Sequence, residues 1–262
     1  MTRRLRGFFL EIWLPVAVVG GWWFLSEDST SPFFPPLRVI VDAFEANWVF
    51  ERIGSDLLPS LQRFGLGLAI AAVAGIAVGT MLGLWTPVRR ATAPVVDFLR
   101  SIPAPALISI MILLIGFDDK MKVSSIALAS FFPVLLNTID GVRGVEPQQL
   151  DMARAYKLSR RHRIFRIILP AATPQIFAGL RIALAVALLV MAFSEMFAST
   201  NGLGFFILFA QETYRIPDMW SGIIMLGLVG YAVNVVFLLV ERRALRWHRG
   251  WRATARDAGG AA

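Results

Sequence analysis

The sequence predicts an all-α, polytopic membrane protein with about six transmembrane helices. Hydrophobic residues make up 56% of the 262 residues and charged residues only 17%, whereas soluble domains average roughly 45–50% and 25%. Apolar stretches long enough to cross a hydrocarbon core of ~30 Å recur along the chain. Lys and Arg gather at alternate ends of these stretches. We therefore expect a bundle of membrane-spanning helices whose orientation is set by charge.

The first expected span covers residues 9–25 and is followed by an external segment. Glu11 and Pro15 lie near the start of this span, and no small-residue cleavage pattern follows it. We interpret the span as a retained helix and not as a removed signal peptide. The segment after it is rich in carboxylates, so residues 1–58 are expected to form an N-terminal helix with an amphipathic external segment.

The second expected span, residues 61–85, has small residues on one face. Ala71, Gly75, Gly79 and Gly83 are spaced four apart, and such a face lets another helix approach closely. Packing against a helix of the same subunit is the favoured interpretation, and a subunit interface is the alternative.

Prolines interrupt the third expected span, residues 91–116. Pro103 lies in the motif Ser-Ile-Pro-Ala-Pro-Ala, which begins at Ser101, and proline removes a backbone donor and clashes with the preceding turn. We expect either a kinked helix or two half-helices. The remaining spans are expected over residues 123–142, 167–197, which is long enough to be tilted, and 219–240.

Charge predicts the orientation of the chain, because short cytoplasmic loops hold an excess of Lys and Arg. Most of the 26 Lys and Arg residues lie before the first span, after the second, after the fourth and after the last. Both termini are therefore expected in the cytoplasm. The tail, residues 244–262, is basic and ends in small residues, and we expect it to be disordered.

Several function classes are excluded by the composition. No Gly-Lys pair occurs, so the chain has no G-x-x-x-x-G-K-[ST] phosphate loop. His162 and His248 both lie in basic segments and cysteine is absent, so we expect no metal site, no Ser-His-Asp triad and no cofactor. The cations lie at span ends and not on one soluble face, which argues against nucleic acid as a partner.

The polar stretch between the fourth and fifth spans predicts two helices that meet at a corner. Pro147 suits a first helical turn, and the helix should run to about Tyr156. Ser159 can cap a second helix that begins at the next residue. A small apolar knob surrounded by cations would lie at this corner, formed by Met152, Ala155, Tyr156 and Leu158. From these residues alone, the knob fits either lipid headgroups or a groove on a soluble partner.

The same stretch resembles a known signature. The spacing is that of the EAA signature of bacterial ABC importer permeases, which reads E-A-A, three residues, G, nine residues, I-x-L-P. The matching residues are Asp151-Met152-Ala153, then Lys157, then Ile167, Leu169 and Pro170. Four more stretches, which begin at Leu99, Gly116, Phe131 and Asn201, are similar to the aliphatic sulfonate, taurine and nitrate branch of this binding-protein-dependent family. The resemblance covers approximately residues 36–247.

Two positions depart from the signature. Lys157 replaces the usual Gly, and a left-handed turn would cost a lysine about 1–2 kcal/mol. Asp151 replaces Glu, and its shorter carboxylate can pair with Arg154 three residues later.

The resemblance implies a type I ABC importer permease fold with residues 59–243 as the permease core. It implies that a coupling helix near residues 147–159 docks on a dimer of cytoplasmic ABC ATPase subunits. The implied ATPase-coupling residues are Asp151, Met152, Ala153, Arg154, Ala155, Tyr156, Lys157, Leu158, Ser159, Ile167, Leu169 and Pro170. ATP hydrolysis would belong to the ATPase, so the chain itself is not expected to be an enzyme.

The resemblance implies further partners and a location. An external substrate-binding protein would dock against residues 26–56 and 199–218, and a second permease subunit, expected to be an identical copy, would complete the pathway. Membrane lipids would surround the assembly in the bacterial inner membrane. The implied substrate is a sulfonate, taurine, nitrate or a similar small organic anion. The alternative is a secondary transporter or a membrane scaffold that works without an ATPase.

Polar groups within spans are the candidates for the pathway or its gate, because an ionised group costs about 2.5–3.5 kcal/mol or more at the bilayer centre. Asp97 and Arg100 lie three residues apart and can neutralise each other, whereas Ser194 and Glu195 are expected to line or gate the outer mouth. Snorkelling or intersubunit pairing is the alternative for each. The candidates are Asp97, Arg100, Pro103, Arg181, Ser194 and Glu195.

Overall fold

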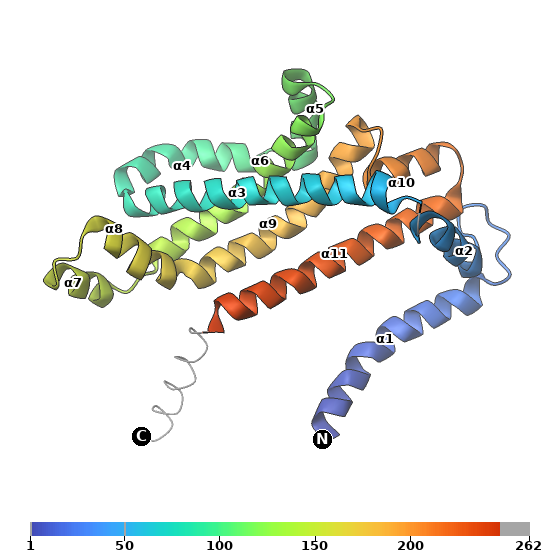
Figure 1. The fold of residues 1–262 in the computed structure, drawn as a ribbon, viewed down its shortest axis with the longest axis horizontal. Helices are drawn as coiled ribbons and strands as arrows, with labels where there is room; N and C mark the ends of the chain where they lie inside the picture. Colours follow the sequence, from blue (N-terminus) through green and yellow to red (C-terminus); the bar gives the residue numbers. More distant parts are fainter. Residues whose placement is uncertain (1, 50, 247–262) are drawn as a thin grey trace. The chain divides into compact units, whose positions relative to one another are not determined.

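The computed structural model describes residues 2–49 and 51–246, except for the side chains of residues 2–12, and every regular element in this range is helical (Figure 1). The all-α prediction is therefore confirmed for the described chain. The basic tail predicted to be disordered lies outside this range from residue 247 onward. The elements are α1 Thr2–Ser26, α2 Leu37–Trp48, η1 Ile53–Leu57, α3 Leu58–Leu84, α4 Thr86–Ser101, α5 Ala104–Ile115, α6 Asp119–Arg143, α7 Pro147–Ala155, α8 Arg160–Arg163, η2 Ile164–Ile168, α9 Leu169–Ala198, α10 Leu203–Glu212 and α11 Ile216–Ala244, where η marks a π-helical turn.

The described residues account for up to five of the predicted spans. Four continuous helical segments are long and apolar enough to cross a membrane, namely Ile53–Leu84, Asp119–Arg143, Arg160–Ala198 and Ile216–Ala244. The fifth, if the bent pair is taken as one span, is α4 with α5, which bend by 95° at the break before Ala104. Of the two predicted alternatives, a kinked helix or two half-helices, the structure has two separate helices. The span predicted over residues 9–25 lies on α1, whose described apolar part, Trp13–Ser26, is shorter than a full span.

The chain forms two compact units. The first contains residues 1–59 and 201–227, and the second contains residues 60–200 and 228–262. Aromatic rings hold the first unit together. Trp22 lies 5.8 Å from Phe34 and 5.4 Å from Trp220 between ring centroids, and Trp48 packs edge-on against Phe206 at 5.0 Å. These contacts join segments that are far apart in the sequence.

The centre of the second unit is the pair α6 and α9, with α3 packed against α6. The glycines of α3 make this packing possible, because a Cβ at Gly75 would lie 2.8 Å from Val134 and a Cβ at Gly79 would lie 2.7 Å from Thr138. Gly83 faces α6 in the same way. The small-residue face is therefore used for close packing within one chain.

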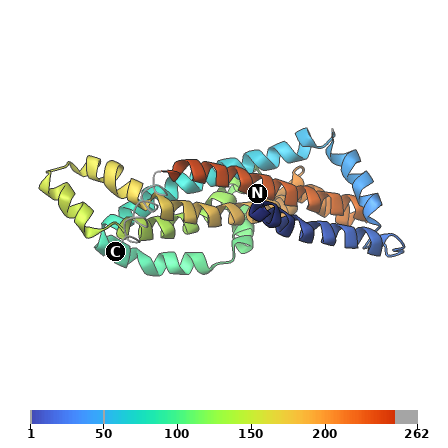
Figure 2. The same ribbon diagram turned by 90° about the horizontal axis from the view of Figure 1, so that it is seen from below.

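The helix α4 lies at the edge of the second unit. It has no buried residue, and Figures 1 and 2 show it beside the α6 and α9 pair, with α5 turning away from it. The helix α4 thus presents a face that no other described element of its own unit covers.

Candidate functional site

The corner between α7 and α8 is built around a left-handed residue. Lys157 has φ +50°. Its N–H donates to the carbonyl of Arg154 at 2.9 Å, and the N–H of Leu158 donates to the carbonyl of Ala153 at 3.0 Å. These two bonds form a Schellman motif, which normally has glycine at the left-handed position. The lysine adopts the turn that the signature implies, at a cost of about 1–2 kcal/mol.

The second helix of the corner is capped as the sequence predicts and continues into the membrane. Ser159 Oγ accepts the N–H of His162 at 3.4 Å, and α8 passes through η2 into α9 without a break. Pro170, in the first turn of α9, has no N–H for the carbonyl four residues earlier, and the π-helical turn η2 lies at that carbonyl. The end of the signature therefore lies where α8 joins the long helix α9.

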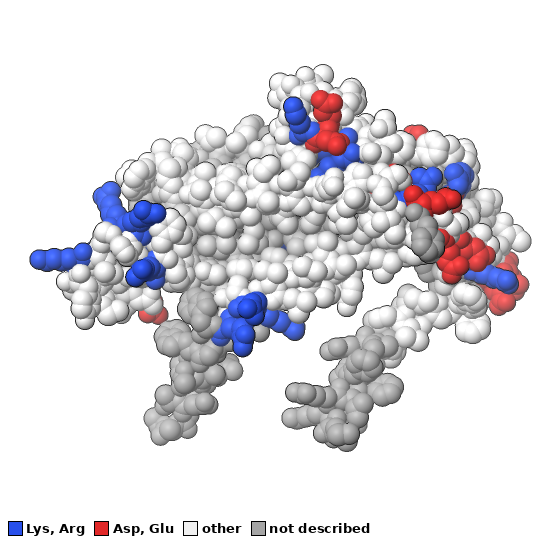
Figure 3. Space-filling view, in the orientation of Figure 1, with Lys and Arg blue, Asp and Glu red and all other residues white. Residues whose placement is uncertain are grey.

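The outer face of the corner, here called the apolar knob, consists of Met152, Ala155, Tyr156 and Leu158. Tyr156 is 76% exposed, Met152 58% and Leu158 42%. Figure 3 shows Lys and Arg side chains gathered over α7 and α8 around this surface. Large apolar groups exposed together, with charges at the rim, are typical of a site that contacts another molecule.

The inner face of the corner is fixed to the core of the second unit. Ala153 is only 2% exposed, and Leu150 and Ile164 pack against a buried cluster that includes Val142 and Ile168. Asp151 and Arg154 form the ion pair that the spacing allows, at 3.0 Å, but both side chains are exposed, so the pair contributes only a few tenths of a kcal/mol. A displacement of the corner would therefore be transmitted to α6 and α9 through apolar contacts.

A buried ionic cluster lies elsewhere in the second unit and contains Glu195. Arg63 Nη1 lies 2.9 Å from Glu195 Oε1, and Arg63 Nη2 lies 2.8 Å from Asp119 Oδ1. Ser60 donates to the Glu195 carboxylate at 2.8 Å, and Lys122 Nζ lies 3.0 Å from Asp119. The cluster joins α3, α6 and α9, and the side chain of Glu195 is completely buried.

The other candidates for the pathway lie in different surroundings. Ser194 is buried and donates to the carbonyl of Met191 at 2.9 Å. Asp97 and Arg100 form the expected pair at 2.9 Å, but both are more than half exposed on α4, beside Pro103, which precedes α5. Arg181 of α9 pairs with Glu241 of α11. The structure thus pairs Asp97 with Arg100 on α4 and places Glu195 in a separate cluster with Arg63, and the gate role of Ser194 and Glu195 stays a prediction.

A second ionic centre, in the first unit, was not predicted from the sequence. Asp56 Oδ1 accepts the N–H of Gly202 at 2.9 Å, and Asp56 Oδ2 lies 3.2 Å from Arg52 Nη1. Gly202 has φ +112°, a conformation that is essentially limited to glycine. The signal for it in the sequence is the glycine-containing stretch that begins at Asn201, one of the stretches that carry the family resemblance.

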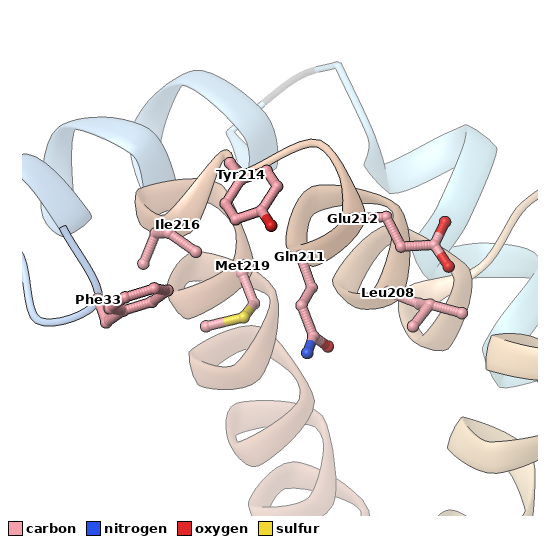
Figure 4. A pocket seen from close by; sticks show the side chains of 7 residues that line it. All are labelled: Phe33, Leu208, Gln211, Glu212, Tyr214, Ile216 and Met219. Atoms are coloured by element: carbon pink, nitrogen blue, oxygen red, sulfur yellow. The ribbon is translucent and has the colours of Figure 1, made fainter.

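The first unit also contains a pocket of about 570 Å³ (Figure 4). It lies where α10 turns into α11, at Tyr214, a second left-handed residue with φ +56°. The pocket is lined by Phe33, Leu208, Gln211, Glu212, Tyr214, Ile216 and Met219. Tyr214 is 79% exposed, and the pocket falls in the segment that the family resemblance assigns to docking of a binding protein.

Among the residues that the structure describes, no three His, Cys, Asp or Glu side chains form a group that could hold a metal ion.

Comparison with known proteins places this geometry in a family. The model of the binding-protein-dependent transport system inner membrane component matches residues 67–246. The chain is 29% identical over 251 residues, 95% of this chain and 91% of the relative, to a Bacillus subtilis (strain 168) protein provisionally assigned as an aliphatic sulfonates transport permease. It is 30% identical over 234 residues, 87% of this chain and 85% of the relative, to the taurine transport system permease protein of Escherichia coli (strain K12).

The fold is similar to that of a solved structure. A chain of the MetNI methionine ABC transporter in an inward-facing conformation aligns with a TM-score of 0.63 and 15% identity, which covers 72% of this chain and 94% of that chain. This likeness shows a shared type I importer permease fold.

Proposed function

Because the chain belongs to the family of binding-protein-dependent transport system inner membrane components, we propose that it is the permease subunit of an ATP-driven importer for a small anion. The proposed substrate class is a sulfonate, taurine, nitrate or a similar organic anion, carried by alternating access. ATP hydrolysis belongs to a separate ATPase subunit, and both termini of the chain face the cytoplasm of a bacterium. The observation that carries the proposal is the corner between α7 and α8.

The corner has the properties of a mechanical contact. The apolar knob is exposed and fits helix-in-groove docking on a soluble partner, while the inner face of α7 packs against the core through Leu150 and Ala153. The helix α8 is continuous with the span α9. A movement of the ATPase groove would therefore displace a membrane-spanning helix directly.

The broken pair α4 and α5 supports a second permease subunit. Lipid cannot satisfy backbone groups at a helix break and is a costly environment for the exposed Asp97–Arg100 ion pair. Large apolar side chains that include Phe98 and Leu113 are 68% and 86% exposed on the same pair of helices. A second copy of the chain that covers this face would shield the break and leave a polar pathway beside Pro103.

The first unit supports docking of the external binding protein. Exposed carboxylates on this unit include Glu27, Asp28, Asp42 and Glu45, with Glu212 beside the pocket at Tyr214. A partner with a basic rim would be steered to such a surface. Substrate selection then belongs mainly to the binding protein.

Transport in proteoliposomes tests the proposal. The chain is reconstituted with its ATPase and binding protein, and uptake of labelled taurine, an alkanesulfonate and nitrate is measured. We expect uptake of at least one anion that requires ATP and the binding protein together. Uptake by the chain alone, driven by an ion gradient, would identify a secondary transporter and contradict the proposal. Asp97→Asn with Arg100→Gln should slow uptake, and the matched exposed change Arg90→Gln should not.

A further inference from the structure

The second unit contains a pocket between α3 and α8, close to the corner between α7 and α8. It has a volume of about 470 Å³ and is lined by Met81, Leu84 and Trp85 on one side and by Arg160, Arg163 and Ile164 on the other. Neither the coupling contact nor the ionic clusters use this pocket.

The two arginines of the pocket, Arg160 and Arg163, have no anionic partner among the residues that the structure describes. In the part of the chain that the structure describes, neither guanidinium forms an ion pair or a hydrogen bond with another side chain. Arg160 is exposed and Arg163 is half-buried, so both remain able to bind a ligand. Guanidinium groups bind phosphate through paired N–H donors.

The apolar wall of the pocket continues along the exposed face of α3. Leu66, Ile70 and Val73 on this helix are 59%, 51% and 72% exposed, as expected for side chains that face lipid tails. Trp85, at the end of the span, is 54% exposed, and indole rings favour the headgroup level of a bilayer. The two arginines and Trp85 therefore suit the headgroup of a phospholipid, and the apolar wall along α3 suits one of its acyl chains.

We propose that this pocket binds one anionic phospholipid, with the phosphodiester between Arg160 and Arg163 and an acyl chain along α3. Basic pockets between spans on the cytoplasmic side are known sites for anionic headgroups. The bound lipid would hold α8 against the end of α3. Because α8 follows the turn at Lys157, the lipid would also fix the direction in which α7 points. The importance of that direction for transport rests on the proposed coupling function.

Quenching of tryptophan fluorescence by brominated lipids tests the site. The purified full-length chain in a nonionic detergent is titrated with dibrominated phosphatidylglycerol and, separately, with dibrominated phosphatidylcholine. Subtraction of the signal of Trp85→Phe isolates the quenching at Trp85. Both lipids carry a phosphodiester, but the choline cation of phosphatidylcholine neutralises its headgroup and is repelled by the two arginines. At about 1 kcal/mol for each cation near an anionic headgroup, we expect phosphatidylglycerol to reach half-saturation at a roughly tenfold to thirtyfold lower mole fraction.

Charge variants decide whether the pocket is the site. Arg160→Gln with Arg163→Gln should remove the preference for phosphatidylglycerol. The matched pair Arg161→Gln with Arg166→Gln removes the same charge from the same segment but outside the pocket, and it should keep the preference. The proposal is overturned if the first pair retains the preference, if both pairs lose it equally, or if Trp85→Phe leaves the quenching unchanged.

A competition experiment separates a lipid from a free phosphate. Excess glycerol 3-phosphate should fail to displace the brominated lipid, because the apolar wall contributes to binding, and complete displacement would overturn the lipid assignment. The assay contains no ATPase, so a failure of the proposed coupling function would leave its result unchanged.

Discussion

Removal of one partner of the buried Arg63–Glu195 pair is predicted to destabilise the second unit strongly, because the other charge would stay buried. In Glu195→Ala, Arg63 would stay 4% exposed and keep Asp119 as a charged partner, while Ser60 would lose the Glu195 carboxylate as an acceptor. Removal of one partner of a buried ion pair costs about 3–5 kcal/mol. Because Asp119 lies 2.8 Å from Arg63 and partly compensates the charge, we expect a loss near the lower limit, about 3 kcal/mol.

The isosteric change Glu195→Gln separates charge from hydrogen bonding. The amide oxygen can still accept from Ser60 and from Arg63, so the expected loss is smaller, about 1.5–2 kcal/mol. The measurement is the free energy of unfolding in mixed micelles, titrated with a denaturing detergent and followed by tryptophan fluorescence. A double-mutant cycle with Arg63→Met should give a coupling energy of about 1–3 kcal/mol between the two side chains.

The exposed Asp97–Arg100 pair on α4 provides the comparison for the loss of a buried charged partner. Asp97→Asn should change the free energy of unfolding by less than about 1 kcal/mol, because exposed ion pairs contribute little. The reasoning would be refuted if Glu195→Ala were as mild as Asp97→Asn, or if the effects of the changes at Arg63 and Glu195 simply added.

Further changes test other parts of the structure. Glu195→Gln should alter uptake while the ATPase stays bound, and unchanged uptake would count against a gate at this position. Gly79→Ala should lower the melting temperature, because its Cβ would lie 2.7 Å from α6, whereas Gly65→Ala, with nothing within 4 Å, should not. Lys157→Gly should stabilise the protein by about 1 kcal/mol by relieving the left-handed conformation, which is checked as a rise in melting temperature. Gly202→Ala, at φ +112°, should destabilise it by about 1–3 kcal/mol in the unfolding titration, and an unchanged transition would contradict the strain argument.

Local signals in the sequence predicted the corner well. Pro147 marks the start of α7, Ser159 caps α8, and the spacing from Asp151 to Lys157 places the turn where the Schellman bonds occur. Each of these signals depends on residues that are close in the sequence. The helix break near Pro103 was predictable for the same reason, since a proline acts on its own turn.

The ionic clusters were not predictable, because they depend on tertiary packing. Arg63 and Glu195 are 132 residues apart in the sequence, and a charge near the end of a span gives no indication of its partner. Asp56 lies in the carboxylate-rich external segment, and nothing near it in the sequence indicates that it accepts the N–H of Gly202. The short helices α2 and α10 were also missed as separate elements, because apolar segments of 12 and 10 residues fall below the length of a span.

The most direct test of the coupling function is the recovery of an ATPase with the tagged chain purified from its native membrane in mild detergent. The wild type is compared with the double variant Arg154→Glu, Leu158→Asp, which places one anionic group in the apolar knob and one beside it. The control is Arg161→Glu, a charge reversal outside the knob. The molar ratio of ATPase to permease is measured by quantitative mass spectrometry. We predict that the ATPase accompanies the wild type and the control and is lost from the knob variant. Absence of an ATPase from the wild type, or its full retention by the knob variant, would contradict the assignment of this corner as the ATPase contact.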